Sequence, residues 1–500
     1  MVYIMKSIAL RPDWKGPAEI FRHTWEGLVN IDQFRWMVRR DAQEHLKMAH
    51  DELGARHVRA VGIFDDEMRT LGTDPKSFFH APAEGNKPRN NWQVTDYVID
   101  SLLDIGINPM FTTTFTPSAM ASGTQTVFST KGNITPPKEL AEWGDLVESG
   151  VRHMLDRYGR AVVEKFYFEV WNEPNLSSFW TGDQKQFFDL WAATYRAIKN
   201  VDATLRVGGP STARAEWIGE IIEYGRRNDC APDFIITHVY NNDSDSSPLS
   251  PFEGPQKDKE SKSPHFAAGV IRGVRKLLDT LGFKGELHWN EWGRSWWPYF
   301  PSRESANEAA FIAKTMGEVS QQADFFAYWC LSDIYDQVGY GAETFHGNYG
   351  LLNLQGLRKP SYHAFQALGM MGTHRIGLKG DNLDEMNNAV VTADKDSFEI
   401  LVYSYQPDDA QSSLDISLDL PPGSTDLKLN PINAAENNIL EKWREMGSPA
   451  YLKRPQLLEL RASNRFSSSQ TGIRLETKQD KCTAAFRMAT PGVALLCGKR

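Results

Sequence analysis

Two glutamates lie at the ends of apolar segments and are the strongest candidates for chemistry in this 500-residue chain. Glu173 closes the segment KFYFEVWNE, and Glu291 closes the segment GELHWNE. Taken singly, each would more simply be a solvated residue at a strand end. Taken together, two carboxyl groups that face each other can hydrolyse a glycosidic bond, because one protonates the leaving oxygen while the other attacks the anomeric carbon. Their mutual repulsion raises one pKa, which keeps that group protonated near neutral pH.

Polar side chains near these glutamates are of types that suit a sugar ligand. Asn172 immediately precedes Glu173, so its amide would project beside the acid and could bind a 2-hydroxyl group. His238 and Tyr240 are two residues apart in the segment DFIITHVY, and side chains two apart on a strand point to the same side. A single histidine in such a place is more often a structural polar residue, and that alternative stays open here.

Short apolar runs alternate with amphipathic stretches from about residue 24 to residue 333, which predicts the elements that position these side chains. Most runs are continuously apolar, as expected for parallel strands buried on both faces. Eight strands alternating with helices indicate a (β/α)8 TIM barrel, an α/β fold whose chemistry lies at the C-terminal ends of the strands. A doubly wound open sheet is the alternative, which the lack of a glycine-rich dinucleotide motif after the first strand disfavours. The predicted strands are 24–31, 56–64, 108–115, 165–172, 204–210, 233–240, 285–291 and 324–332.

The pattern changes after about residue 370, where apolar and polar residues alternate. This alternation is typical of antiparallel strands with one solvated face, and it predicts a C-terminal antiparallel β-sandwich accessory domain. We expect an N-terminal strand within 1–22 that joins the sandwich, a catalytic barrel over 23–345 and the sandwich over 346–500. A polar loop at 241–263 follows the sixth barrel strand and should lie on the catalytic face. The sandwich segments are 398–406, 414–420, 473–479 and 482–497.

Composition excludes several other classes of protein. The formal net charge of −9 argues against a nucleic-acid or anionic-membrane partner, and no stretch approaches the roughly 20 apolar residues of a membrane span. The four cysteines are far apart and match no zinc spacing, so we expect no metal site and no cofactor. The N-terminus shows no signal-peptide pattern, which favours a cytoplasmic protein. The sequence does not indicate the oligomeric state.

The glutamate motifs resemble those of glycoside hydrolase family 39, in particular its β-xylosidase branch. FYFEVWNEPN followed by LSSFWTG carries the likeness most strongly. The resemblance implies a barrel with a β-sandwich and a double displacement that retains anomeric configuration. It also implies that Glu173 is the acid/base and Glu291 the nucleophile, in agreement with the residue types alone. Further similar segments are 52–68, 118–147, 233–243, 325–337 and 347–365.

The resemblance extends to residues around the catalytic pair. It implies that the Tyr240 hydroxyl contacts the nucleophile, that His238 contacts a sugar hydroxyl, and that Trp329 lies under the −1 sugar. It also implies that Phe128 forms an aromatic wall and that Asp336 contacts the 3- and 4-hydroxyl groups of the sugar. A barrel-filling role for Trp329 is the simpler alternative.

Two more residues are candidates from their types and places. Arg59, on the second strand, could stabilise the Glu291 anion by its charge, although a surface arginine is the simpler interpretation. Trp297 is one of four aromatic residues within 296–300, shortly after Glu291, and we expect it to close the pocket.

Two departures from the family pattern leave the sugar open. Val61 stands where a histidine is usual, and Gln337 replaces one of two acidic residues. The leading hypothesis is a retaining exo-β-glycosidase, a β-xylosidase that acts on short xylo-oligosaccharides. The alternatives are α-L-arabinopyranosides, α-L-iduronides or another glycan, and a sugar-binding protein without turnover. An iduronide would need extra cations, of which Arg294 is the one near the motifs, and a binding protein would be expected to have lost a glutamate or Asn172.

Overall fold

The structure is a computed structural model that describes residues 6–72, 89–245, 256–260, 263–335, 337, 339, 341–469, 472–478 and 481–500. Eight parallel strands form one sheet, and each contains part of a segment predicted to be a strand. The sheet closes into a barrel where the amide of Leu331 donates to the carbonyl of Asn30 at 2.9 Å. The barrel is therefore confirmed. In sheet order the strands are β3 (Leu28–Gln33), β4 (His57–Val61), β7 (Asn108–Thr112), β10 (Tyr167–Glu169), β11 (Arg206–Thr212), β12 (Phe234–Tyr240), β15 (Glu286–Gly293) and β16 (Phe325–Tyr328).

A helix follows each barrel strand and covers its outer face. Local signals set their ends: Asp183 and Gln186 form a capping box at the start of α5, and Gly54 ends α1 with φ of 72°. The helices are α1 (Arg40–Leu53), α2 (Gln93–Ile105), α3 (Leu140–Tyr158), α4 (Arg160–Val163), α5 (Gln184–Val201), α6 (Ile218–Arg227), α7 (Phe266–Thr280), α8 (Ala306–Val319) and α9 (Pro360–Gly369). Among the described residues no helix is long and apolar enough to cross a membrane.

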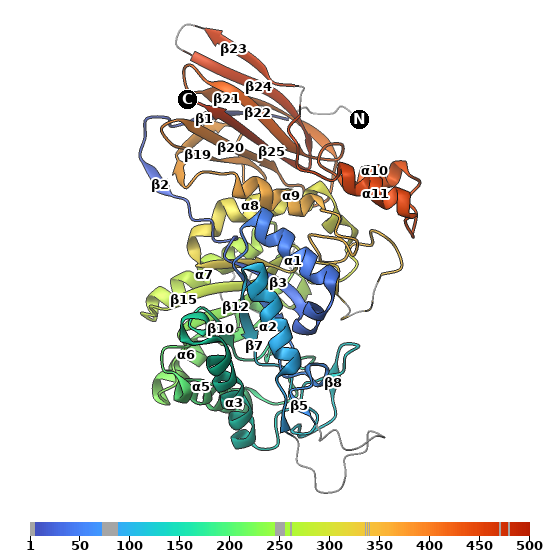
Figure 1. The fold of residues 1–500 in the computed structure, drawn as a ribbon. Helices are drawn as coiled ribbons and strands as arrows, with labels where there is room; N and C mark the ends of the chain where they lie inside the picture. The colour runs from blue at the N-terminus through green and yellow to red at the C-terminus, as the bar shows by residue number, and fades with distance from the viewer. Residues whose placement is uncertain are drawn as a thin grey trace.

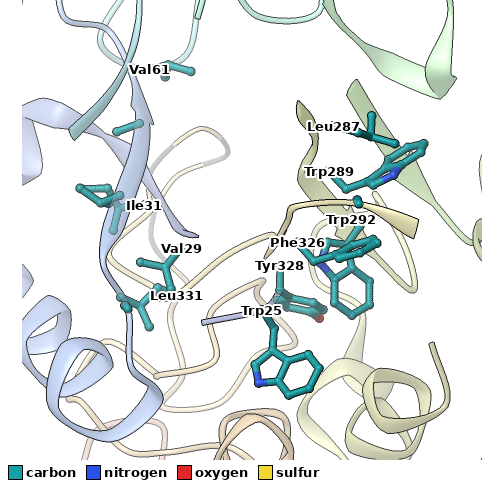
Figure 2. Close-up of a cluster of buried hydrophobic side chains, with 14 of the residues drawn as sticks. Trp25, Val29, Ile31, Val61, Leu287, Trp289, Trp292, Phe326, Tyr328 and Leu331 are labelled. Atoms are coloured by element: carbon teal, nitrogen blue, oxygen red, sulfur yellow. The ribbon is translucent and has the colours of Figure 1, made fainter. Parts of the chain in front are cut away.

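Successive side chains of each barrel strand point alternately into and out of the barrel, which gives an inner and an outer layer of side chains. Outward residues pack under the helices, as Figure 2 shows for Trp292 of β15 and for Phe326 and Tyr328 of β16. The inward residues form a small apolar cluster that fills the barrel: Leu28, Met110, Tyr167, Phe234, Ile236 and Ala327. Two positions further along three of these strands stand Thr112, Glu169 and His238, all buried. The polar site therefore lies directly above the apolar filling.

The second domain consists of two packed sheets. One has the order β18–β1–β21–β24–β23 and the other β2–β17–β19–β20–β25–β22. Most pairs are antiparallel, but β1 runs parallel to β21, with Ile8 opposite Ile416. The strands are β1 (Lys6–Pro12), β2 (Ala18–Ile20), β17 (His374–Ile376), β18 (Leu378–Asp381), β19 (Asn387–Ala393), β20 (Ser397–Ser404), β21 (Ser412–Leu420), β22 (Thr425–Ile432), β23 (Arg474–Lys478), β24 (Lys481–Thr490) and β25 (Gly492–Lys499). Helices α10 (Ile439–Glu445) and α11 (Arg454–Ser463) lie between β22 and β23 in the sequence.

Helices α8 and α9 lie between the barrel and the sandwich (Figure 1). Helix α8 packs against β20 and β25, and Arg375 donates to the carbonyl of Gly317 at 2.7 Å. Helix α9 lies beyond residue 345, where we expected the sandwich to begin, yet it also contacts α1 of the barrel. Both domains therefore share these helices as one continuous packing surface.

Short elements shape the loops around the barrel mouth. Of the polar loop at 241–263, residues 246–255 and 261–262 lie outside the described residues, and the remainder forms a two-stranded piece. The short strands pair as β5 (Leu71–Gly72) with β6 (Arg89–Asn90), β8 (Thr126–Val127) with β9 (Gly132–Asn133), and β13 (Ser244–Asp245) with β14 (Gln256–Glu260). The 3₁₀ turns are Phe34–Val38, Asp66–Met68, Ala213–Ala215, Pro301–Glu304 and Ser320–Gln322.

Candidate active site

A cavity of about 650 Å³ lies at the C-terminal ends of the barrel strands. This volume is within the range of small-molecule sites, roughly 300–1,000 Å³. Most of the residues proposed from the sequence line it: Asn172, Glu173, His238, Tyr240, Glu291, Trp297 and Trp329. Val61 and Gln337, the two residues that differ from the family pattern, also line the cavity. Asp336 lies outside the described residues.

Glu173 and Glu291 face each other in this cavity. One carboxylate oxygen from each, with a ring nitrogen of His238, lies within 4.8 Å of the others. Glu291 is on β15 and is 6% exposed, while Glu173 follows β10 and is 8% exposed. Glu173 has a left-handed φ of 46°, and its amide donates to the carbonyl of Ser211 at 2.8 Å. A non-glycine residue held in that region carries backbone strain, which is common where a side chain must be aimed at a site.

The two carboxyl groups have different partners. Glu291 receives a hydrogen bond on each oxygen, from Arg59 Nη1 to Oε1 and from the Tyr240 hydroxyl to Oε2, the latter at 3.0 Å. Burial raises the pKa of Glu291, and His238 and Arg59 oppose that rise. Burial raises the pKa of Glu173 to about 7, against the opposing charges of Arg59 and Arg214. The donors on both oxygens favour the anion at Glu291, while Glu173 holds a proton up to neutral pH.

Arg59 is fully buried and connects the strands beneath the cavity. Its Nε donates to Glu169 Oε2 at 2.9 Å, its Nη2 to Glu169 Oε1 at 3.0 Å, and its other donors reach Glu291 and Asn172. Burial would lower the pKa of Arg59, but the charges of Glu169 and Glu291 outweigh it and raise that pKa. The guanidinium therefore stays charged and holds the nucleophile candidate in place, so Arg59 is no surface arginine.

Asn172 is oriented by the same guanidinium. Arginine can only donate, so Asn172 Oδ1 faces Arg59 Nη2. The amide nitrogen of Asn172 is then left to donate from the cavity wall beside Glu173. This orientation suits a hydroxyl group of a bound sugar.

Aromatic rings form much of the remaining wall. Trp329 is buried and lies edge-on to Tyr335, with 6.1 Å between ring centroids. Trp297 is 49% exposed and stacks on Trp296, which is 38% exposed, at a centroid distance of 4.2 Å. Flat apolar faces of this kind suit the faces of sugar rings, and the exposed pair stands at the rim.

Phe128 occupies a different place from the one expected. It is not among the residues that line the cavity, but its ring packs edge-on against Phe179, which does line it, at 5.7 Å. The strand pair β8–β9 positions this ring, with Phe128 at φ of 64° immediately after β8. Phe128 thus supports the aromatic wall from behind.

Sequence reasoning missed several polar residues of the site. Glu169 is fully buried and also accepts from Thr112 Oγ1 at 2.6 Å and from Asn290 Nδ2 at 2.9 Å. A glutamate inside an otherwise apolar strand was the available signal, because such a residue needs a buried cation. Arg214 and Asp243 also line the cavity, but both lie in loops, and no pattern assigns them a role, although Asp243 ends the similar segment 233–243.

Gln337 has both ends of its amide engaged. Its Nε2 donates to Asp32 Oδ1 at 2.6 Å, and its Oε1 accepts from the Tyr335 hydroxyl at 2.6 Å. Val61 adds an apolar surface to the cavity. Neither position offers the charged or imidazole group that the family pattern would place there.

The cluster of Glu173, His238 and Glu291 is also the one group among the described residues whose spacing would allow a metal ion. Its donor set does not favour a cation, because the Arg59 guanidinium already contacts Glu291. A divalent ion at Glu291 would lie beside that fixed positive charge. The arrangement fits proton transfer and nucleophilic attack better.

Comparisons with known proteins agree with this geometry. A family profile described as Glycosyl hydrolases family 39 matches residues 11–472. A β-xylosidase from Caldicellulosiruptor saccharolyticus is 35% identical over 447 residues, covering 87% of this chain and 87% of that protein. One from Geobacillus stearothermophilus is 30% identical over 486 residues, covering 95% and 90%. The crystal structure of a monomeric β-xylosidase from Caulobacter crescentus CB15 matches with a TM-score of 0.83 and 30% identity over 99% of each chain. The chain therefore belongs to glycosyl hydrolases family 39 and is a glycosidase enzyme, as its motifs predicted.

Proposed function

We propose that this glycosidase is a retaining β-xylosidase that releases xylose from the ends of short xylo-oligosaccharides. The observation that carries the proposal is the pairing of Glu173 with Glu291, whose nearest carboxylate oxygens lie within 4.8 Å. Retaining enzymes hold these groups about 5–5.5 Å apart, whereas inverting enzymes need roughly 6.5–9.5 Å to admit a water molecule. The names of the relatives, which match over most of the chain, support the choice of sugar.

The first step transfers the sugar to the enzyme. Glu291, held as an anion by Arg59 and Tyr240, attacks the anomeric carbon with one carboxylate oxygen. The bond from that carbon to the leaving oxygen breaks as Glu173 donates its proton to that oxygen. The products are a glycosyl ester on Glu291, the shortened oligosaccharide and an ionised Glu173.

The second step returns the enzyme to its starting state. Glu173, now ionised, removes a proton from a water molecule, whose oxygen attacks the anomeric carbon and displaces Glu291. Two inversions at one carbon give net retention. Asn172 supports both steps, because its amide can bind a hydroxyl group next to the reacting carbon.

Product stereochemistry tests the proposal directly. Proton NMR during hydrolysis of nitrophenyl β-xyloside, which releases a single xylose, should show β-xylose first, followed by slow mutarotation to the α-anomer. Initial formation of α-xylose from this substrate would overturn the retaining mechanism. A panel of nitrophenyl glycosides tests the sugar, and a clear preference for the α-L-arabinopyranoside or α-L-iduronide would overturn the xylosidase assignment.

Azide rescue tests the two glutamates separately. In Glu173→Ala, azide should restore turnover of an activated aryl xyloside and yield a β-glycosyl azide, because azide replaces water without a general base. In Glu291→Ala, azide should yield an α-glycosyl azide instead. Undiminished activity of either variant with xylobiose would refute its assigned role.

A further inference from the structure

The loop that follows β11 is held in a strained conformation at the cavity wall. Ser211 near the end of β11, and Arg214 and Ala215 in the loop, have left-handed φ angles of 55°, 59° and 54°. Asn175, two residues after Glu173, pins the loop by donating to the carbonyl of Ala213 at 3.0 Å and accepting from its amide at 3.0 Å. Strain that is held in place by such contacts is typical of functional positions, and here it places Arg214 at a set position relative to Glu173.

Arg214 carries a donor that the protein does not use. Its Nη1 donates to Ser244 Oγ at 3.2 Å, and its Nη2 pairs with Glu216 Oε1 at 3.0 Å. Its Nε is buried and has no hydrogen-bond partner among the residues that the structure describes. Arg214 lines the cavity and its side chain is 28% exposed, and Nη1 and Nη2 each keep a second N–H group that a ligand in the cavity can meet.

Arg214 lines the cavity on the same side as Glu173. Its positive charge is one of the causes that lower the pKa of Glu173 against burial. Asp243 lines the same wall, and its carboxylate is fixed by the amide of Tyr240 at 2.8 Å. In a double displacement the nucleophile and the leaving group occupy opposite faces of the anomeric carbon, with the acid beside the leaving oxygen. The wall beyond Glu173 is therefore where the departing sugar must lie.

The segment 240–245 joins this wall to the aromatic rim. Ser244 accepts from Arg214, while Asn242 Oδ1 accepts from the amide of Trp296 at 3.0 Å. The segment thus carries Asp243 and contacts both Arg214 and Trp296, so that donors, a carboxylate and a flat ring line the same cavity. This combination matches a sugar ring, which offers hydroxyl groups at its edge and apolar faces.

We propose that Arg214, with Asp243 and Trp296, forms the subsite for the leaving-group sugar, and that this subsite takes an uncharged, hydroxyl-bearing ring. The inference rests on the proposed function. Arg214 is already paired with Glu216, so the wall offers hydrogen-bond donors without a net positive charge. An acidic leaving group would meet the Asp243 side chain on this wall and is disfavoured.

Two substrates with different leaving groups separate this role from a general one. Nitrophenyl β-xyloside has an activated leaving group without hydroxyl groups, whereas xylobiose places a second sugar in the subsite. For Arg214→Met, kcat/KM for xylobiose should fall about 10- to 100-fold, the range for hydrogen bonds to a charged group. The value for the nitrophenyl substrate should fall less than threefold, and transfer of xylose to a sugar acceptor should decline in parallel with xylobiose hydrolysis.

Three further variants complete the experiment. Arg214→Lys keeps the charge but loses the planar donors, so it should leave the basic limb of the pH profile in place while still losing activity on xylobiose. Ser244→Ala removes one contact of Arg214. If the arginine variants fail to fold, this variant replaces them in the same comparison of the two substrates. Arg226→Met changes an exposed arginine on α6, which donates to the carbonyl of Leu281, and should affect neither substrate.

Each outcome has a separate meaning. An equal loss on both substrates would show that Arg214 acts through Glu173 and would overturn the subsite. Undiminished xylobiose hydrolysis in Arg214→Met would overturn it as well. If the unaltered enzyme cleaves neither β-xyloside, the proposed function itself fails, and the failure is recognised before any variant is compared.

Discussion

Oε1 of Glu173 lies 2.9 Å from Nδ1 of His238, and the proton in that contact belongs to the glutamate. The other ring nitrogen, Nε2, lies 3.3 Å from Ser211 Oγ, whose own proton is donated to Glu169. Nε2 must therefore donate to Ser211. Burial lowers the pKa of His238 to about 4, so the ring is neutral at pH 7 and Nδ1 can only accept. Glu173 is thus protonated in this arrangement, as its proposed role of general acid requires.

Replacing His238 by Asn should shift the alkaline limb of activity. A hydrogen bond to the protonated form of Glu173 raises the pKa of Glu173, so its loss lowers that pKa. The limb of kcat/KM, expected near pH 7 in the unaltered enzyme, should move to lower pH. The measurement is the pH dependence of kcat/KM on an aryl xyloside. His374→Asn, an exposed histidine of the sandwich, is the control, and a fall in rate with an unmoved limb would contradict the assignment.

Removing the charge at Glu173 should stabilise the fold, and by an amount that depends on pH. The folded pKa of about 7 lies above the ordinary 4.5, so the unfolded chain ionises first as pH rises. Between these values the free energy of unfolding falls with pH, and above pH 7 the penalty levels off at about 3 kcal/mol. Glu173→Gln has no such penalty. Its gain in urea midpoint over the unaltered protein should be near zero at pH 4 and largest at pH 8, and a gain independent of pH would refute this account.

The barrel and its glutamate pair could be predicted from the sequence because both follow from position along the strands. A continuous apolar run indicates a parallel strand, and parallel strands bring their C-terminal ends together, so Glu173 and Glu291 had to meet at one end. His238 and Tyr240 follow from the same rule, since residues two apart share a side. Each of these predictions uses information that lies within a single strand.

Arg214, Asp243 and the position of Phe128 could not be predicted because they depend on loop conformation. The left-handed backbone at Arg214 is held by Asn175 and by packing, and no local pattern of residues encodes it. Glu169 could be predicted only in part. Its strand was predicted, but whether its side chain points into the barrel depends on the register of the strand. Its partner Arg59 lies on another strand, and only the closed barrel brings the two together.

Glu169→Gln should destabilise the fold strongly. Arg59 would lose its bidentate partner while remaining buried and charged, and breaking such a pair costs about 3–5 kcal/mol. Urea unfolding followed by circular dichroism should show a lower midpoint. Asp381→Asn, which breaks the exposed pair with Arg11, is the matched control and should leave the midpoint unchanged. Equal midpoints for the two variants would contradict the prediction.

The sandwich supports the aromatic rim through Asp409. This carboxylate accepts from Arg294 Nη2 at 3.1 Å and from the Ser302 hydroxyl at 2.5 Å, both in the loop that carries Trp296 and Trp297. Asp409→Ala should loosen that loop and raise KM for oligosaccharides, with little change in kcat, because the glutamates are not touched. Steady-state kinetics and tryptophan fluorescence provide the measurement. A fall in kcat at unchanged KM would contradict a purely supporting role.

The parallel pairing of β1 with β21 has a consequence for synthesis. On the ribosome β1 emerges before the barrel, yet its neighbours in the sheet, β18 and β21, are translated only after the whole barrel. The barrel can therefore begin to fold while β1 is still unpaired, and the sandwich closes last, around a strand that was synthesised before the barrel. A strand that is synthesised early is thus one of the last to be paired in the folded protein.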